Sequence, residues 1–321
     1  MPEAERRDPA APASGGPPVS TSEFEALFDS LASWRRGEPV DEAGRLGSRG
    51  PADVLAAVGA VRHGETVSLA LPVSSEAGPD NPRPALHHMV DLGDVEPCEP
   101  STHKDFLGLD YHGKAVTHLD ALCHIGYRGE LFGGVASAAA VSSLGSRWAA
   151  VTALSSGIFV RAVLYDLPRV SGIDWLEPGQ AVHAEDLLAA EEALGARAGA
   201  GDALLLRSGH QRRRADLGPW DSDAASAGLH VGAMELLDAR GVAVLGADGD
   251  SDVRPSPVEG VHSPVHALAL TALGIVLLDN LDLEGLADAC ARHRQYDFLL
   301  VVAPLVVPRG TGSPVNPIAV L

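Results

Sequence analysis

The chain has 321 residues, 45% of them hydrophobic, and its formal net charge is −19, which excludes wholesale disorder but gives a strongly acidic surface. Such a surface is unfavourable for phosphate backbones and for anionic lipid, so we expect no nucleic-acid partner and no membrane partner. The longest apolar stretch, near residues 298–307, is too short to span a bilayer, no secretory signal opens the sequence, and three cysteines fit a reducing cytoplasm.

The first twenty residues differ in composition from the rest of the chain. They are rich in proline, alanine, serine and glycine, which predicts a disordered tail over residues 1–20. Residues 21–321 are then expected to form a single domain. Its first helix is indicated by apolar residues at helical spacing after a cap at Thr21 or Ser22. These apolar residues are Phe24, Leu27, Phe28 and Leu31.

Between residues 50 and 100 the sequence predicts a helix, a strand and a proline-rich loop. The spacing of Leu55, Val58 and Val61 predicts a helix over residues 53–62. The stretch TVSLALP, residues 66–72, is typical of a strand. The many prolines of residues 74–100 predict an ordered loop rather than regular structure.

From residue 158 onward, predicted strands and helices alternate. Strands are predicted over residues 158–167, 203–207, 242–246, 275–279 and 296–303. Helices are predicted over residues 184–196, 230–239, 264–273 and 283–291. Apolar strands alternating with helices favour an α/β domain whose central sheet is covered by helices. The sequence contains neither glycine-rich fingerprint of nucleotide-binding folds.

Potential metal ligands are densest between residues 112 and 124. On an extended chain His118 and Asp120 point to the same side, about 7 Å apart along the strand. His124 joins them only if the chain turns in between, and His112 only if Gly113 allows a bend. Imidazole and carboxylate are the usual ligands of Zn²⁺, Mn²⁺ and Fe²⁺. The alternative is a hydrogen-bonded His–Asp pair without metal.

Other residues with reactive or charged side chains are interpreted mainly as structural. Cys123 is expected to be a buried, inert thiol. Asp248 and Asp252 lie in an acidic loop after a strand, which indicates solvated carboxylates that cap the next segment rather than ligands. Arg207, at a strand end, fits either a substrate carboxylate or an ion pair.

The stretch THLDALCH, residues 117–124, resembles the H-x-G-T-H-x-D-x-P-x-H signature of the cyclase family of metal-dependent hydrolases. This family includes bacterial kynurenine formamidase and isatin hydrolase. Further motifs follow in the family's order, and the similarity runs from about residue 55 to the C-terminus. They are GDALLLRSG (201–209), GVAVLGAD (241–248), LDNL (278–281) and GSPV (312–315). The resemblance implies a mixed central sheet in a swivelling β/α/β-like domain, as in kynurenine formamidase.

The resemblance also implies a set of metal ligands. The family's central His and Asp fall on His118 and Asp120, and its last motif His falls on His124. Its later Glu and His correspond to Asp279 and His266. One or two divalent ions per chain, zinc or manganese, are therefore expected.

Two positions depart from the family's signature. The family's first His, four residues before the central one, is Lys114 here, and His112 is the obvious substitute. The motif's proline is Leu122. With these changes, a single ion held by His118, Asp120 and one more histidine is as consistent with the sequence as a pair of ions.

This set of residues predicts a metal-dependent hydrolase. A metal-activated water would attack a small amide, lactam or ester. His124 is expected to act as a ligand or as the catalytic acid or base. One alternative is a cyclase or dehydratase of natural-product metabolism; another is a metal-free binding homologue, in which Lys114 repels the cation. The resemblance further implies a homodimer or homotetramer acting on a small-molecule substrate.

Overall fold

The computed structural model describes residues 18–93 and 100–321. Residues 1–17 of the predicted tail, and Cys98, lie outside the described residues. Val19 pairs with Val258, so the ordered chain begins before residue 21. The cap of helix α1 (Thr21–Leu31) is Ser20, whose side chain accepts a hydrogen bond from the backbone N–H of Glu23, and not Thr21 or Ser22.

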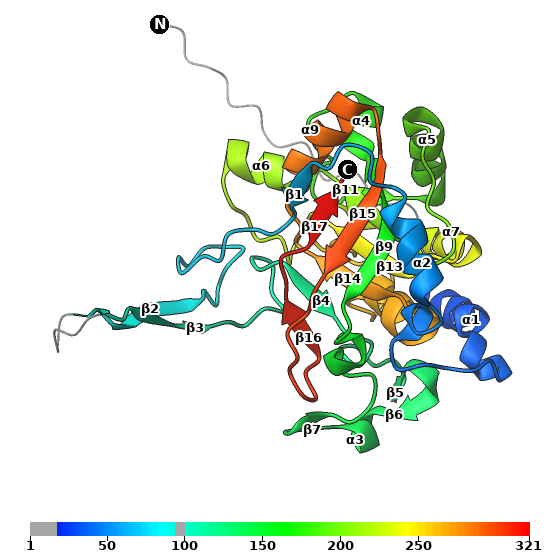
Figure 1. Cartoon of the computed structure of the whole chain (residues 1–321). Helices are drawn as coiled ribbons and strands as arrows, with labels where there is room; N and C mark the ends of the chain where they lie inside the picture. Colours follow the sequence, from blue (N-terminus) through cyan, green and yellow to red (C-terminus); the bar gives the residue numbers. More distant parts are fainter. Residues whose placement is uncertain (1–17, 94–99) are drawn as a thin grey trace, which may run out of the picture.

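Within the described residues, nine strands form one mixed sheet (Figure 1). Their order across the sheet is β1 (Thr66–Ser68), β17 (Ile318–Val320), β15 (Asp297–Val302), β9 (Ile158–Asp166), β11 (Ala203–Arg207), β13 (Val244–Ala247), β14 (Val276–Asp279), β4 (His118–Asp120) and β16 (Gly312–Pro314). Strands β9, β11, β13 and β14 are parallel, and the others pair antiparallel. The predicted mixed sheet is therefore confirmed.

Helices cover the sheet, as expected for an α/β domain. They are α2 (Pro51–Val58), α4 (Leu167–Ser171), α5 (Ala184–Leu194), α6 (His210–Leu217), α7 (Ala233–Arg240), α8 (Pro264–His266) and α9 (Glu284–His293), with the π-helical η5 (Ala267–Leu273). Because both faces are covered, the parallel strands are continuous apolar runs, and Leu164, Leu205 and Leu277 are fully buried. No helix in the described ranges is both long and apolar enough to cross a membrane.

Shorter elements surround this core. They are the ribbons β5 (Glu130–Leu131) with β6 (Val135–Ala136), β7 (Val141–Ser142) with β8 (Gly145–Ser146), and β10 (Ala181–Val182) with β12 (Gly228–Leu229), the helix α3 (Ser137–Ala140), and the 3-10 turns η1 (Ser33–Arg36), η2 (Gly44–Leu46), η3 (Phe132–Gly134) and η4 (Val151–Leu154).

Two sequence predictions in the N-terminal part need correction. The helix predicted over residues 53–62 is present as α2, but it spans Pro51–Val58 and turns Ala57 inward, while Leu55 and Val58 are 73% and 47% exposed. The proline-rich loop predicted over residues 74–100 contains a regular strand, β2 (Leu86–Asp91). That strand pairs antiparallel with β3 (Lys104–Gly108), beyond the prolines.

Strands β2 and β3 project from the body as a two-stranded ribbon (Figure 1), which we call the arm. Apolar side chains on and beside it are about half exposed or more: Leu86, Met89, Val90, Leu92, Phe106 and Leu107. Leu86, His88 and Phe106 share one face, and Met89 and Leu107 share the other. The arm therefore presents apolar surface on both faces.

Candidate metal centre

The predicted ligands meet beside strands β4 and β14. In the sheet register His118 lies opposite Asp279, and Asp120 lies opposite Leu277. Asp279 ends the parallel strand β14, and the loop after β13 lies at the same edge. The carboxyl ends of parallel strands are where α/β sheets bind ligands, so these side chains gather at the expected edge.

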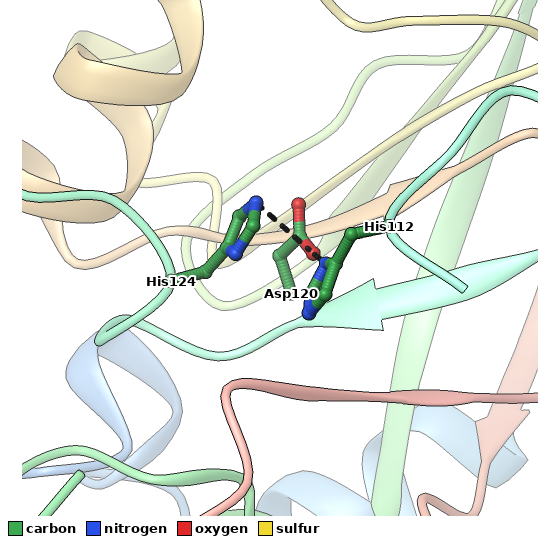
Figure 2. A group of neighbouring side chains, drawn as sticks. All are labelled: His112, Asp120 and His124. Carbon is green, nitrogen blue, oxygen red and sulfur yellow. Dashed lines mark ion pairs between the residues drawn. The ribbon is translucent and has the colours of Figure 1, made fainter. Parts of the chain in front are cut away.

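Asp120 lies at the centre of the histidines (Figure 2). Its Oδ1 atom is 2.8 Å from His112 Nδ1, 3.5 Å from His118 Nε2 and 4.0 Å from His124 Nε2. The His112 and His124 rings stack, with centroids 3.9 Å apart. His124 reaches this place because the chain turns after Ala121, and His112 because it bends over residues 112–116.

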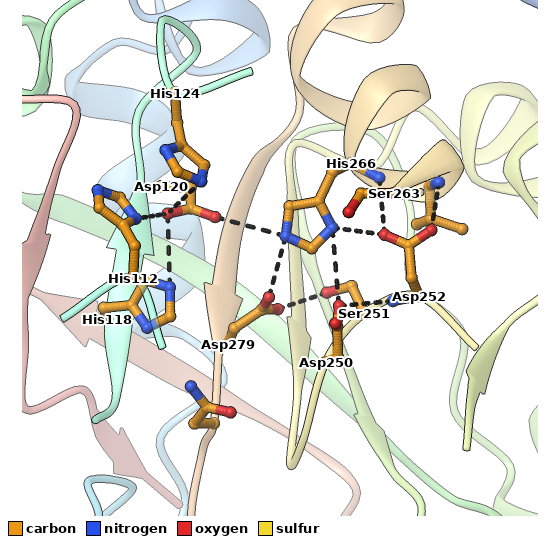
Figure 3. Close-up of polar contacts among 12 residues, drawn as sticks. His112, His118, Asp120, His124, Asp250, Ser251, Asp252, Ser263, His266 and Asp279 are labelled. Atoms are coloured by element: carbon orange, nitrogen blue, oxygen red, sulfur yellow. Dashed lines mark hydrogen bonds and ion pairs between the residues drawn. The ribbon is translucent and has the colours of Figure 1, made fainter. Parts of the chain in front are cut away.

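Two further residues complete the cluster from the other side (Figure 3). His266 Nε2 lies 3.6 Å from Asp120 Oδ2 and 3.2 Å from Asp279 Oδ2. All six predicted residues are thus brought together. Tetrahedral bonds of about 2.1 Å place ligand atoms roughly 3.4 Å apart, so these separations suit ligands of a shared ion.

The strongest indication of a cation is Asp120 itself. It is 1% exposed, and no described residue donates a hydrogen bond to either of its carboxylate oxygens. His112 Nδ1 is also buried, and its approach to Oδ1 does not have the geometry of a hydrogen bond. A buried carboxylate without donors is costly unless a cation satisfies it, so the donor set fits a divalent ion.

Outer contacts orient the histidines. His118 Nδ1 lies 2.8 Å from the Val116 carbonyl and His112 Nε2 lies 3.0 Å from Thr311 Oγ1, which leaves the other nitrogen of each ring toward Asp120. A Cβ at Gly312 would come within 2.8 Å of the His112 ring, so glycine there leaves room for it. These contacts are typical of metal-binding histidines.

His266 is oriented by Asp252. Its Nδ1 atom lies 2.6 Å from Asp252 Oδ2, and the same carboxylate accepts the backbone N–H groups of Val265 and His266 at the start of α8. Ser251 Oγ donates to Asp279 Oδ1 at 2.6 Å. The loop after β13 thus holds both His266 and Asp279 in place.

Lys114 pairs with carboxylates other than Asp120. Its ammonium group pairs with Asp250 Oδ2 and lies 3.5 Å from Asp223. Arg254 Nε donates to the same Asp250 oxygen at 2.9 Å, and Asp250 is 1% exposed on its side chain. The expected position of the family's first His is therefore taken by a cation already paired with a buried carboxylate.

Burial and neighbouring charges shift the protonation of the cluster. Burial lowers the pKa of His124 to about 4, so this imidazole is neutral at pH 7. Burial raises the pKa of Asp120, but His118 and His112 lower it more, and it lies below its usual value. For His266, burial lowers the pKa, while Asp252 and Asp279 raise it well above its usual value. The cluster thus attracts positive charge.

The cluster opens into a cavity of about 500 Å³. Its wall includes the side chains of the cluster, with Lys114 and Arg254 beside them. Residues 79–83 and Asp110, which adjoin the two strands of the arm, also line the cavity. This volume suits a small molecule.

Three predictions about other residues can be compared with the structure. Asp248 and Asp252 are 1% and 0% exposed, so the solvated acidic loop is wrong. The predicted capping of the next segment is confirmed for Asp252, which accepts backbone N–H groups where α8 begins, and Asp248 does the same where α6 begins. These bonds satisfy the buried carboxylates. Arg207 forms ion pairs with Asp166 and Glu284, and Cys123 is buried with a pKa that burial raises.

Sequence reasoning did not single out Asp250, Arg254 or Thr311. Asp250 and Arg254 contact the cluster only through the fold of the loop after β13, and Thr311 through the pairing of β16 with β4. The acidic run GADGDSD was the one available signal for Asp250.

Comparisons with known proteins agree with this picture. The family model described as "Putative cyclase" matches residues 67–251. A search of curated proteins found no match. The crystal structure of a novel cyclase is 27% identical, with a TM-score of 0.79, over 92% of this chain and 99% of that one.

Isatin hydrolases share the fold at lower identity. Isatin hydrolase A from Ralstonia solanacearum is 21% identical, with a TM-score of 0.56, over 85% of this chain and 97% of its own. An isatin hydrolase bound to the product analogue thioisatinate is 21% identical, with a TM-score of 0.55, over 84% and 95% of the two chains.

Proposed function

The chain belongs to the cyclase family, and from this premise we propose that it is a metal-dependent hydrolase of a small amide, lactam or ester. The observation that supports this most is the buried Asp120, whose two oxygens face four histidines and receive no hydrogen bond from any described residue. A divalent ion held there, zinc or manganese, would supply the Lewis acidity that activates water and polarises a carbonyl.

The residues of the cluster have distinct proposed roles. His118, Asp120, His266 and Asp279 lie at ligand-like separations and would hold the ion. His112 supplies a further nitrogen next to Asp120. His124, the neutral imidazole farthest from Asp120 Oδ1, is proposed to take the proton from water and return it to the leaving group.

Two alternatives make different predictions for this site. A cyclase or dehydratase would use the same ion on a natural-product intermediate without releasing an acid. A metal-free binding homologue was suggested by Lys114, because an ammonium group repels a cation. Its pairing with Asp250 weakens that argument, since the four buried carboxylates of the site outnumber its two cations, Lys114 and Arg254.

The test is metal analysis of the purified protein, followed by a substrate panel. We expect the wild type to carry zinc or manganese and Asp120→Asn, which preserves side-chain shape, to lose the metal and at least 1,000-fold of the activity while remaining folded. Asp223→Asn, a cavity carboxylate that is 60% exposed, is the matched control and should retain the metal. Full metal occupancy in Asp120→Asn would refute the proposal.

The substrate panel separates the reaction types. N-formyl amides, lactams and lactones test hydrolysis, and poly-carbonyl chains test cyclisation. Release of a carboxylic acid supports the hydrolase, whereas cyclisation alone supports the alternative reaction.

We also propose that the chain forms a homodimer through the arm. A two-stranded ribbon with apolar surface on both faces is marginal in water unless something covers it. Within the ribbon Lys104 pairs with Asp91, and His87 Nε2 lies 3.0 Å from Asp105, so the two strands carry little unpaired charge toward another copy of this acidic chain. A twofold pairing buries the same apolar residues from both copies. A cytoplasmic location stays a prediction.

A further inference from the structure

Lys114 is one of only two lysines in the chain. The other, Lys104, lies on the arm with 63% of its side chain exposed, whereas the Lys114 side chain is 22% exposed and lines the cavity. A lysine placed there, in a chain that otherwise uses arginine for its cations, calls for an explanation in terms of the site.

Lys114 is held in this position by the backbone around it. Asn280 Nδ2 donates to the carbonyl oxygens of Gly113 and Val116, at 2.7 and 3.0 Å, on either side of Lys114. Asn280 follows Asp279, so the segment that carries Lys114 is fixed to the end of β14. The ammonium group therefore stays on Asp250, beside the cluster.

The buried charges of the site do not balance. Four carboxylates, each 4% exposed or less, surround it: Asp120, Asp250, Asp252 and Asp279. Two cations, Lys114 and Arg254, pair with Asp250. With the histidines in the neutral form that binds a metal ion, the site carries two net negative charges. The nearby buried Asp166 and Asp248 are compensated separately, by Arg207 and by backbone amides at the start of α6.

We propose that Lys114 acts as a fixed cation that limits the centre to a single divalent ion. The ligand geometry alone would admit more, because two groups share Asp120: His112 with His124, and His118 with Asp279. One divalent ion brings the buried charge to zero. A second would leave two uncompensated positive charges in a buried site, which is strongly unfavourable. This inference rests on the proposed metal centre.

The experiment counts ions and does not need a substrate. The protein is stripped of metal, loaded with excess Mn²⁺ or Zn²⁺, passed through a desalting column and analysed for metal per chain, and the second ion is titrated calorimetrically. We expect one ion per wild-type chain. Lys114→Met should bind two, with the dissociation constant of the second ion lowered at least tenfold.

Two controls isolate the charge at this position. Lys104→Met removes the other lysine of the chain, and Lys114→Arg keeps the cation; both should bind one ion. Should Lys114→Met fail to fold, judged by circular dichroism, Lys114→Gln carries the same expectation.

Each outcome is decisive. Two ions in the wild type, or one ion in the folded Lys114→Met protein, would overturn the role of Lys114 while leaving the proposed hydrolase intact. No ion in any variant would overturn the metal centre itself, and this inference with it.

Discussion

Asp252 is not among the residues that line the cavity, but it orients one of the proposed ligands, His266. It is fully buried, it receives the N–H groups that open α8, and it lies 2.6 Å from His266 Nδ1. One carboxylate thus fixes both the helix start and the orientation of the imidazole. His266 Nε2 is left facing Asp120 and Asp279.

We predict that Asp252→Asn weakens metal binding by about 10- to 100-fold, because the amide orients His266 less firmly and makes it a poorer ligand. The measurement is the dissociation constant of Zn²⁺ in competition with a chromophoric chelator. Asp288→Asn, on the exposed side of α9, is the control and should bind as the wild type does. Equal Zn²⁺ affinity in both variants would show that Asp252 stabilises the start of α8 without affecting metal binding.

For single residues, the sequence predicts contacts between positions that are close in the chain, but not contacts between positions that only the fold brings together. His118 and Asp120 share a face because strand side chains alternate, and their closeness follows from two positions of sequence. His266 and Asp279 were expected only through the family resemblance. Asp250 and Arg254 could not be found from spacing, because their contacts depend on how the loop after β13 folds back.

Among the elements, the arm exposes apolar side chains that no other described strand covers. Its strands pair only with each other in the described residues, and its apolar side chains are open to water. The same apolar faces would cover each other in the proposed dimer.

We predict that Phe106→Asp converts a dimer to a monomer, because the new charge is buried against its counterpart in the second copy. Light scattering coupled to size exclusion should give twice the chain mass of 33.2 kDa for the wild type and one chain mass for the variant. Leu188→Asp, at a 44% exposed position on α5, should leave the mass unchanged. A monomeric wild type, or a dimeric Phe106→Asp, would contradict the proposed interface.

The elements of the second half could be read from sequence because buried parallel strands are unbroken apolar runs, and the predicted strand over 203–207 coincides with β11. Strand β2 could not, because half-exposed strands lack that signal and prolines surround it. The helix predicted over 264–273 changes to π-helical geometry directly after His266, a distortion often found at functional sites that periodicity does not register.

For the whole molecule, the candidate ligands come from segments that are far apart in the chain. Residues 112–124 meet α8 and the end of β14. A bound ion would join these segments in the folded state only, so binding should stabilise the fold.

We predict that removing the metal with EDTA lowers the melting temperature. An ion present at 100 times its dissociation constant adds about 2.7 kcal/mol to the free energy of unfolding, which corresponds to a shift of roughly 5 °C. Differential scanning calorimetry with and without EDTA measures it, and re-addition of Mn²⁺ or Zn²⁺ should restore the original value. Asp120→Asn should melt at the same temperature with and without EDTA, and an EDTA effect of equal size there would contradict the assignment.

For the whole molecule, the fold class could be predicted from the sequence, but the two strands that complete the sheet beyond β14 could not. Alternating apolar strands and helices identify an α/β domain, but β4 and β16 are three residues each and carry polar ligand residues or proline and glycine. Their place beside β14 is decided by long-range pairing, which no local pattern encodes.

Part of the cavity wall and the arm belong to continuous stretches of chain. Residues 79–83 run forward into β2, and β3 runs on to Asp110 and then to the loop that carries Lys114. A partner that binds the arm would therefore also hold this part of the cavity wall in place. A dimer formed through the arm, as proposed, would therefore also constrain the shape of the cavity in both copies.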